Sequence, residues 1–208
     1  WAGEALIGTI DSYLVYRLTR GAVFATDHTN ASRTLLYNIR DLCWDESLCA
    51  LFDVPVFALP EVRESSASYG ETDLDGLLPQ PVPICGVMGD SQAALFAERC
   101  FQPGMAKVTF GTGSSVLLNV GHEMLLSENG IVTTIGWVYQ GQPVYAFEGI
   151  INFTGATVAW LRDQLKLIES AAETEVLARS IPDNDGVYLV PAFVGLSAPY
   201  WRADVKGA

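Results

Sequence analysis

The stretch "ICGVMGDSQAALF" (Ile84–Phe96) sets a short apolar run directly against a glycine, an aspartate and a helical pattern. The run Ile84–Met88 predicts a buried strand of the parallel kind, and Ser91–Cys100 predicts the helix that follows it. Ligands in α/β proteins bind beyond the carboxyl ends of such strands. Asp90 is therefore either a helix cap, which aspartate favours, or a carboxylate that accepts a proton from a substrate. The two interpretations are compatible.

A second fragment, "VTFGTGSS" (Val108–Ser115), follows within about twenty residues and places Thr112 between two glycines. Gly111-Thr112-Gly113 is either a hairpin turn, for which glycine is the default residue, or a phosphate turn whose N–H groups contact a nucleotide. The P-loop pattern G-x-x-x-x-G-K-[ST] is absent from the chain. Any ATP site here must therefore have another architecture.

Composition restricts the classes of protein that this chain can represent. Half of its 208 residues are apolar and 17% are charged, which is typical of a globular protein. The net charge of −12 argues against nucleic acid as a partner, although a local nest of N–H groups can hold ATP in an acidic protein. No apolar stretch reaches the roughly 18 residues of a membrane span. The four cysteines, without a C-x-x-C pair, predict reduced thiols in a cytoplasmic protein: Cys43, Cys49, Cys85 and Cys100.

The first hundred residues predict helices separated by loops. Asp11–Gly21 has a helical pattern in which Gly21 suits the C′ position after the last turn. Asp45–Phe52 predicts a second, short helix. Pro55–Pro83 contains five prolines and is predicted to be mostly loop.

From Gly104 the pattern changes to strand-forming runs separated by turn signals. These runs predict a meander of antiparallel strands: Ala106–Phe110, Ser115–Val120, Ile131–Tyr139 and Val144–Phe147. An amphipathic helix over Thr154–Ile168, a helix around Glu173–Arg179 and a buried strand over Gly186–Phe193 follow. The change predicts a domain boundary near residues 95–104.

Other polar residues carry weaker chemical signals. His28 and His122 lie far apart in the sequence without a third ligand at metal-site spacing, so no zinc site built from side chains of this chain is expected. No G-x-S-x-G nucleophile elbow occurs. We interpret the remaining candidates as loop charges (Asp73, Asp75) and as packing residues rather than base-stacking platforms (Trp137, Trp160).

Five segments, in order along the whole chain, resemble the glycerol kinases of the FGGY carbohydrate-kinase family. They are "TDHTNASRTLLYNI" (Thr26–Ile39), "GDSQAALF" (Gly89–Phe96), "GMAKVTFGTGSSVLLN" (Gly104–Asn119), "TGATVAWLRD" (Thr154–Asp163) and "GVYLVPAFVGLSAPYW" (Gly186–Trp201). The resemblance implies an α/β protein with two actin-like (ribonuclease H-like) domains and a cleft for ATP and a polyol. Residues 1–95 would be the C-terminal part of domain I, and residues 96–208 the N-terminal part of domain II. We therefore expect the chain to be an internal fragment, inactive by itself.

The resemblance also implies roles for individual residues. Asp90 matches the catalytic aspartate, the general base that deprotonates the attacking hydroxyl, and with Ser91 it would contact the polyol. Gly111, Thr112 and Gly113 match the phosphate turn of the nucleotide site, and Gly155 matches a glycine that lets the nucleotide approach closely. The implied cofactors are ATP and the Mg²⁺ bound with it.

The chain departs from the glycerol-kinase pattern at three positions. Ser91 and Ala159 replace glutamines, and Ser115 replaces a phenylalanine that would wall the polyol. A serine there enlarges and wets the wall, which leaves room for a larger polyol. "LLPQPVP" (Leu77–Pro83) lacks the Gly-Gly-Thr-Arg run that binds a sugar bisphosphate inhibitor in bacterial relatives, so that regulation is not expected.

The resemblance favours phosphorylation of glycerol to glycerol 3-phosphate and leaves two alternatives open. One is another sugar or polyol kinase of the same family. The other is a non-catalytic, actin-like nucleotide-binding module, for which a carboxylate at Asp90 would have no use. A homo-oligomer of the full-length protein also stays open.

Overall fold

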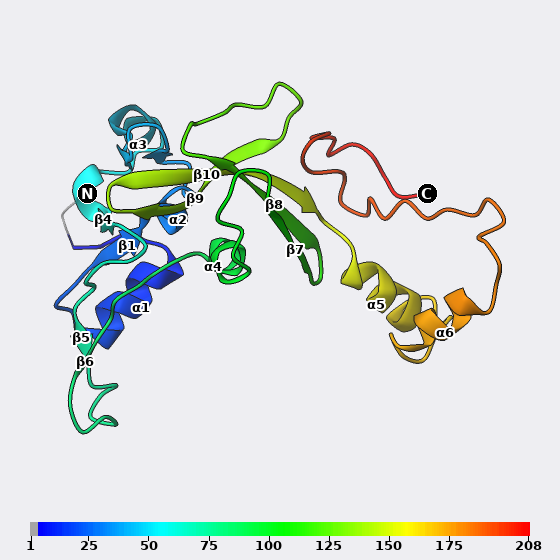
Figure 1. Cartoon of the computed structure of the whole chain (residues 1–208), viewed down its shortest axis with the longest axis horizontal. Helices are drawn as coiled ribbons and strands as arrows, with labels where there is room; N and C mark the ends of the chain where they lie inside the picture. The colour runs from blue at the N-terminus through cyan, green and yellow to red at the C-terminus, as the bar shows by residue number, and fades with distance from the viewer. Residues whose placement is uncertain (1–3) are drawn as a thin grey trace. The chain divides into compact units, whose positions relative to one another are not determined.

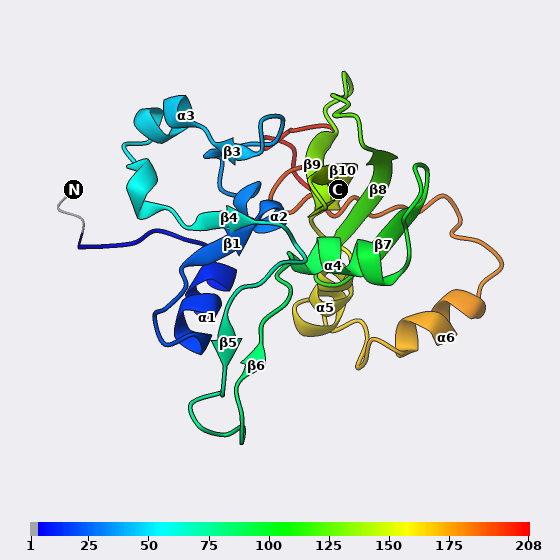
Figure 2. The same ribbon diagram turned by 60° about the vertical axis from the view of Figure 1, so that its left-hand side comes forward.

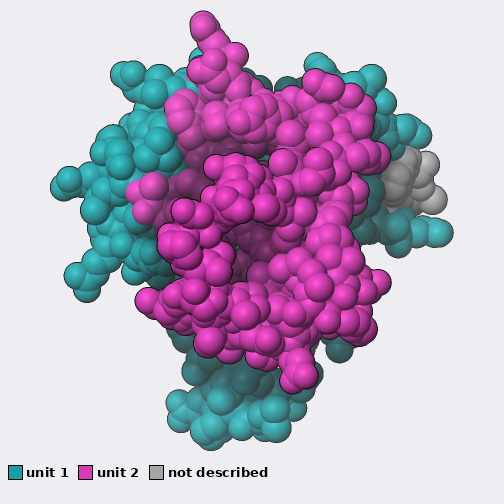
Figure 3. Space-filling view, turned by 90° about the vertical axis from the view of Figure 1, so that its right-hand side faces the viewer, with its two compact units in different colours: residues 1–105, 118–125, 133–146 teal, residues 106–117, 126–132, 147–208 magenta. Residues whose placement is uncertain are grey.

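The computed structural model describes residues 4–208, which form two compact units. Unit 1 contains the described residues up to Met105 together with Leu118–Leu125 and Thr133–Ala146. Unit 2 contains Ala106–Leu117, Leu126–Val132 and Phe147–Ala208. Figure 1 shows the course of the chain, and Figure 3 colours unit 1 teal and unit 2 magenta.

Helix α1 (Ile10–Leu18) ends in a turn closed by two backbone hydrogen bonds. The N–H of Arg20 donates to the carbonyl of Arg17 at 3.1 Å, and the N–H of Gly21 donates to that of Tyr16 at 2.7 Å. This is the Schellman pattern. The C′ residue is therefore Arg20, with a φ of +54°, and the prediction of Gly21 at C′ is wrong by one residue.

Helices α3 (Glu46–Leu51) and α4 (Asp90–Ala97) end in the same way. The C′ residues are Asp53 and Arg99, with φ of +53° and +59°. The bond from the N–H of Cys100 to the carbonyl of Leu95, at 3.1 Å, closes α4, which is therefore shorter than the helix predicted to reach Cys100.

Unit 1 also contains short strand pairs that the sequence did not indicate. Strand β1 (Ala25–Asp27) pairs in parallel with β4 (Glu61–Arg63), and α1 lies beside β1 in both ribbon views (Figures 1 and 2). The other short elements are α2 (His28–Ala31), the pair of β2 (Tyr37–Asn38) with β3 (Cys43–Trp44), η1 (Val56–Ala58), and the pair of β5 (Glu71–Thr72) with β6 (Val82–Pro83). The segment from Pro55 to Pro83 is thus mostly loop, as predicted, apart from these short pieces.

The buried strand predicted over Ile84–Met88 does not form. The segment is extended, and within residues 4–208 its backbone bonds reach Tyr69 and Gly70 from Ile84 and the Ser65 carbonyl from the N–H of Val87. Cys85 is exposed. The apolar composition indicated burial, but a sheet strand also needs a hydrogen-bonded partner strand.

The largest sheet contains β7 (Ala106–Phe110), β8 (Ser114–Gly121), β9 (Val132–Tyr139) and β10 (Gln142–Ile151). Its strand order is β7-β8-β10-β9, so β10 lies between β8 and β9 and the predicted simple meander is wrong. Gln140 and Gly141 join β9 to β10 with φ of +51° and +72°, which is the conformation of a type I′ hairpin turn. The carboxylate of Glu64 accepts both turn N–H groups, at 2.8 and 2.7 Å.

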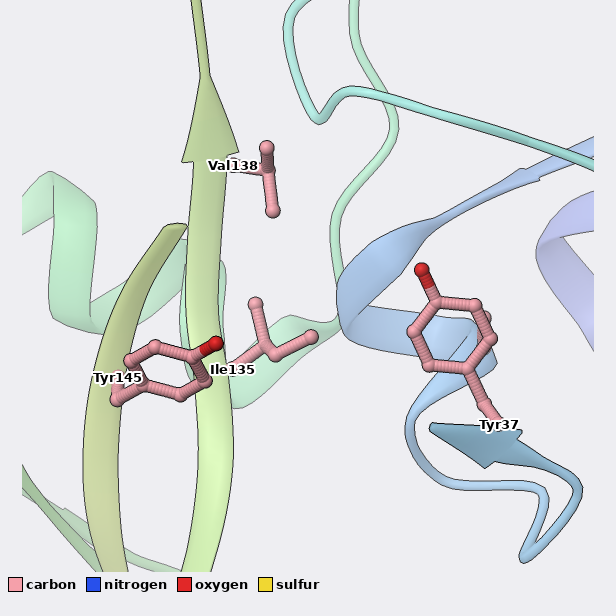
Figure 4. Close-up of a cluster of buried hydrophobic side chains, with 5 residues drawn as sticks. Tyr37, Ile135, Val138 and Tyr145 are labelled. Carbon is pink, nitrogen blue, oxygen red and sulfur yellow. The ribbon is translucent and has the colours of Figure 1, made fainter. Parts of the chain in front are cut away.

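The core of unit 1 includes a cluster of buried side chains from α2, β2, β9 and β10. Figure 4 shows Ile135 and Val138 on β9 and Tyr145 on β10, with Tyr37 facing them; the fifth member is Ala31. The hydroxyl of Tyr145 donates to the carbonyl of Ile39 at 2.9 Å. The cluster thus buries the ring of Tyr145 with its polar end satisfied.

Unit 2 continues from the sheet into α5 (Gly155–Asp163) and α6 (Glu173–Arg179). Helix α5 stops five residues before the predicted end at Ile168. The buried strand predicted over Gly186–Phe193 is absent, and the side chains of Val187 and Tyr188 are 76% and 79% exposed. As at Ile84–Met88, the apolar run carried no information about a pairing partner.

We expect Arg99→Gly to raise the free energy of unfolding by about 0.5–1 kcal/mol. A left-handed conformation costs an ordinary residue about 1–2 kcal/mol and glycine almost nothing, although the flexibility of glycine in the unfolded chain offsets part of the gain. Urea denaturation measures the change. Glu98→Gly is the matched control, because Glu98 has an ordinary φ of −80°. It should lower stability, and equal effects of the two changes would contradict the assignment.

Candidate functional site

The four residues predicted to contact a nucleotide lie together in unit 2. The turn Gly111–Gly113 joins β7 to β8, and its Gly111 N–H donates to the Gly113 carbonyl at 2.8 Å. The start of α5 packs onto this turn. The N–H of Gly155 donates to the Gly111 carbonyl, and the N–H of Ala156 donates to the Thr112 carbonyl, both at 3.0 Å.

Only glycine fits at two of these positions. A Cβ atom on Gly155 would lie 2.5 Å from the Gly111 carbonyl oxygen, and one on Gly113 would lie 2.5 Å from the carbonyl oxygen of Ile151. Both distances are shorter than a side-chain carbon tolerates. The structure therefore gives Gly155 a packing role against the turn, independent of any nucleotide.

The hydrogen bonds leave some donors of the turn available. The first N–H groups of α5 are used by the turn carbonyls, so they are not free to hold an anion. Among residues 4–208, the N–H groups of Thr112 and Gly113 have no backbone partner, and Thr112 is exposed. Adjacent free N–H groups on a tight turn form an anion-binding concavity. The turn can therefore hold a phosphate oxygen.

Asp90 is the first residue of α4 in unit 1, and its side chain is exposed. The N-cap is Gly89, so Asp90 is not the cap residue that one interpretation expected. Its Oδ1 accepts the N–H of Ser91 at 2.7 Å. A carboxylate at a helix N-terminus is stabilised by the helix dipole, and an exposed one can accept a proton from a small molecule.

A buried network that sequence reasoning missed lies behind Asp90. Asp27 has no exposed surface, and its carboxylate accepts five donors. They come from Thr29 (N–H and hydroxyl), Asn30 (N–H and Nδ2) and the Ser65 hydroxyl, which lies at 2.7 Å. The oxygen of the Thr29 hydroxyl accepts the N–H of Gly89 at 2.8 Å. Asp27 precedes Thr29 and Asn30 at the spacing of a helix cap. This spacing was the signal in the sequence from which the hydrogen bonds of Asp27 could have been predicted.

Burial shifts the pKa values of two other titratable groups near this network, His28 and Tyr37. Burial lowers the pKa of His28 from its usual value, although the charges of Asp27 and Glu64 act in the opposite direction. The Nδ1 atom of His28 is hydrogen-bonded to the hydroxyl of Tyr37, and burial raises the pKa of that phenol. A neutral histidine held by one buried hydroxyl is a packing residue rather than a free base.

The remaining candidates have structural partners. Arg20 pairs with Asp73 at 2.7 Å and with Asp75 at 3.7 Å. Trp137 is 7% exposed and packs edge-on against Phe96 and Phe101, so it is a packing residue as predicted. No group of three or more metal-ligating side chains occurs within residues 4–208.

An open hollow of about 570 Å³ in unit 1 is not suited to phosphoryl transfer. Met88, Phe96, Phe101 and Trp137 line much of it, and its lining contains no acidic, histidine, lysine or arginine side chain. Its polar side chains include those of Ser65, Ser66 and Tyr139, but without a charged group the hollow offers neither a base nor a partner for phosphate charge.

Comparison with known proteins identifies the class. The fold is the actin-like, ribonuclease H-like α/β fold of the sugar kinases. A xylulose kinase from Lactobacillus acidophilus matches 96% of the chain at 18% identity, with a TM-score of 0.79 and 40% of that protein covered. The profile of the FGGY family of carbohydrate kinases matches residues 2–97 with its N-terminal domain and residues 106–208 with its C-terminal domain. The chain belongs to the FGGY family of carbohydrate kinases.

Closely similar relatives are named glycerol kinases. The chain is 53% identical over 206 residues to the glycerol kinase of Desulfitobacterium hafniense, and 54% identical over 205 residues to that of Carboxydothermus hydrogenoformans. Each match covers 99% of this chain but 42% and 41% of the relative, respectively. The crystal structure of Plasmodium falciparum glycerol kinase with ADP matches 98% of the chain and 40% of that protein, at 38% identity and a TM-score of 0.86. The chain thus spans about two fifths of the length of these relatives.

Within residues 4–208, the structure contains no helix that combines the length and the apolar character needed to cross a bilayer.

We expect Gly155→Ala to separate α5 from the turn and to destabilise unit 2 by about 1–3 kcal/mol, the usual cost of overpacking. The added Cβ would meet a backbone carbonyl that cannot move without breaking the turn. Thermal denaturation measures the loss. Gly149→Ala is the matched control, because its nearest neighbour would be 4.0 Å away. An unchanged melting temperature for Gly155→Ala would contradict the close contact.

Proposed function

We propose that the protein containing this chain transfers the γ-phosphate of ATP to glycerol, giving glycerol 3-phosphate and ADP. The observation that carries the proposal is the cluster of Gly111, Thr112, Gly113 and Gly155, whose turn keeps two adjacent N–H groups free. Its relatives named glycerol kinase, at 53–54% identity over nearly the whole chain, support the same reaction.

Asp90 is the proposed general base. A glycerol hydroxyl oxygen attacks the γ-phosphorus, the bond from that phosphorus to the oxygen of ADP breaks, and the carboxylate of Asp90 takes the hydroxyl proton. Its exposure and its place at the first residue of α4 support this role. Ser91, the next residue on the helix, is proposed to contact the polyol.

The turn is proposed to hold nucleotide phosphate oxygens through the N–H groups of Thr112 and Gly113 and the Thr112 hydroxyl. Phosphoryl transfer depends on positioning and on neutralising charge, and such a turn contributes to both. Mg²⁺ is proposed to arrive with the nucleotide. This ion commonly binds through substrate phosphates and one or two carboxylates, and residues 4–208 contain no preformed cluster of three ligands.

A second candidate is a kinase of the same family that acts on a larger polyol or sugar. The Oγ atom of Ser115 is buried and has no hydrogen-bond partner within the described residues. Because this atom is not open to a ligand, the second candidate is supported instead by the smaller size of serine than of the phenylalanine in the glycerol-kinase pattern. Steady-state rates with glycerol and with four- and five-carbon polyols separate the two candidates.

We further propose that residues 1–95 belong to domain I and residues 96–208 to domain II. The separate profile matches over residues 2–97 and 106–208 support two domains that meet close to this position, within a few residues of it. Whether the full-length protein is a homo-oligomer is testable by light scattering.

The full-length protein provides the direct test of the proposed function. ADP should form only when both ATP and glycerol are present. ADP production without glycerol, or none with it, would instead favour a nucleotide-binding module.

Asp90→Asn should lower kcat by about 10²–10⁴-fold, because it removes the proton acceptor with almost no change of shape. Coupled measurement of ADP release gives the rate. Glu98→Gln is the matched control: it neutralises an exposed carboxylate just after the last turn of the same helix and should leave kcat unchanged. An Asp90→Asn enzyme with more than about half the wild-type kcat would remove Asp90 from the base role.

Thr112→Val should raise the dissociation constant for ADP about threefold to tenfold, the equivalent of one neutral hydrogen bond. Valine keeps the β-branched shape, so the turn should persist. Titration calorimetry on the full-length protein measures the affinity. Thr112→Ser keeps the hydroxyl and should bind as the wild type does, whereas unchanged affinity in Thr112→Val would leave Thr112 with a turn role alone.

A further inference from the structure

The network behind α4 connects a buried carboxylate to the residue that precedes Asp90. The Thr29 hydroxyl donates its proton to Asp27, at 2.8 Å, and its oxygen accepts the Gly89 N–H, also at 2.8 Å. Asp27 and Thr29 both have no exposed surface. Water therefore cannot replace either hydrogen bond. Gly89 donates to Thr29, and Thr29 in turn donates to Asp27.

Gly89 is the point at which this network can act on Asp90. Glycine is the least restricted residue in its backbone angles, so the direction in which α4 starts depends on what holds Gly89. Its carbonyl accepts the N–H of Ala93 at 2.7 Å inside the helix, and its own N–H is held by Thr29. Both ends of the glycine are fixed, and the Cα atom of Asp90 is one peptide away, about 3.8 Å.

The preceding residues are tied to the same place. The N–H of Val87 donates to the Ser65 carbonyl at 3.1 Å, and the Ser65 hydroxyl donates to Asp27 at 2.7 Å. The segment that leads into α4 is thus attached to the Asp27 carboxylate at two points. Gly89 is attached through Thr29, and Val87 is attached through Ser65.

A simple capping role for Asp27 explains only part of these contacts. As N-cap of α2, its side chain accepts the N–H groups of Thr29 and Asn30. Capping requires neither the Thr29 hydroxyl nor the Gly89 N–H, which lies 60 residues away in the chain. A four-residue helix also needs no buried carboxylate with five donors.

We propose that Thr29, held by Asp27, is a positioning residue for the proposed base: its hydroxyl fixes Gly89 and thereby the place of the Asp90 carboxylate. This proposal rests on the proposed function, in which Asp90 is the general base of the reaction. It adds residues that touch neither substrate nor nucleotide. Their loss should therefore act on the catalytic step and leave nucleotide binding intact. A misplacement of about 1 Å can lower a rate by up to about 10²-fold.

The test compares two buried threonines of unit 1 in the full-length protein. Thr29→Val keeps the shape and removes the hydroxyl that holds Gly89. Thr26→Val does the same to a threonine that is also 0% exposed but whose hydroxyl donates to Asp11, at 2.6 Å. The two changes should lower the melting temperature by similar amounts. Only Thr29→Val should lower kcat, by roughly tenfold, with the KM for ATP unchanged, and Thr29→Ser should restore kcat.

Amide hydrogen exchange at Gly89 gives a readout that does not depend on activity. Exchange should be slow in the wild type and in Thr26→Val, and faster in Thr29→Val. If Thr29→Val does not fold, Thr29→Ala removes the same hydroxyl with less bulk. The alanine variant is then used in place of the valine variant in both measurements. A Thr29→Val enzyme with the kcat of Thr26→Val, or with unchanged exchange at Gly89, would overturn the proposal.

Failure of the proposed function would look different. It would show in the wild type, as absent glycerol-dependent ADP production, before any variant is compared. Failure of the positioning role would show only as equal kcat values of the Thr29→Val and Thr26→Val enzymes in an active protein.

Discussion

Unit 1 depends on the buried carboxylate of Asp27. A carboxylate without exposed surface is costly unless each oxygen is satisfied, and here donors from Thr29, Asn30 and Ser65 supply the hydrogen bonds. These residues come from the start of α2 and from the segment after β4. The N–H of Ser65 also donates to the carbonyl of Val138 on β9. The Asp27 carboxylate therefore holds together segments that are distant in the sequence. The start of α4 is positioned by its hydrogen bond to one of them, at Thr29.

In unit 2, backbone groups do most of the work of holding distant segments together. The turn Gly111–Gly113 and the start of α5 are joined by main-chain hydrogen bonds and by the Thr154 hydroxyl, which donates to the Gly111 carbonyl at 3.1 Å. This arrangement requires glycine, because a side chain at Gly155 would meet the turn carbonyl. Backbone contacts of this kind leave the exposed Thr112 side chain free, which suits a turn proposed to hold phosphate.

The two proposed parts of the site therefore respond differently to substitution. Around Asp90, hydroxyl and carboxylate groups can be removed one at a time, so positioning can be separated from chemistry. Around the turn, main-chain atoms supply the support together with the Thr154 hydroxyl, and a substitution of Gly113 or Gly155 acts by steric overlap. Changes in rate are expected from the first group of residues, and changes in stability or nucleotide affinity from the second.

The sequence by itself determined the elements with strong local signals. It indicated the helices near Asp11–Gly21, Asp45–Phe52 and Glu173–Arg179 and the strand Ala106–Phe110, because caps, helical periodicity and turn residues act within a few positions. Its motifs also selected Asp90 and the Gly-Thr-Gly turn. Only the tertiary structure decided the strand order β7-β8-β10-β9, the absence of strands at Ile84–Met88 and Gly186–Phe193, and the link from Asp27 through Thr29 to Gly89. Strand pairing and buried hydrogen bonds join residues far apart in the chain, and a local pattern indicates that a residue is buried but not which group it meets.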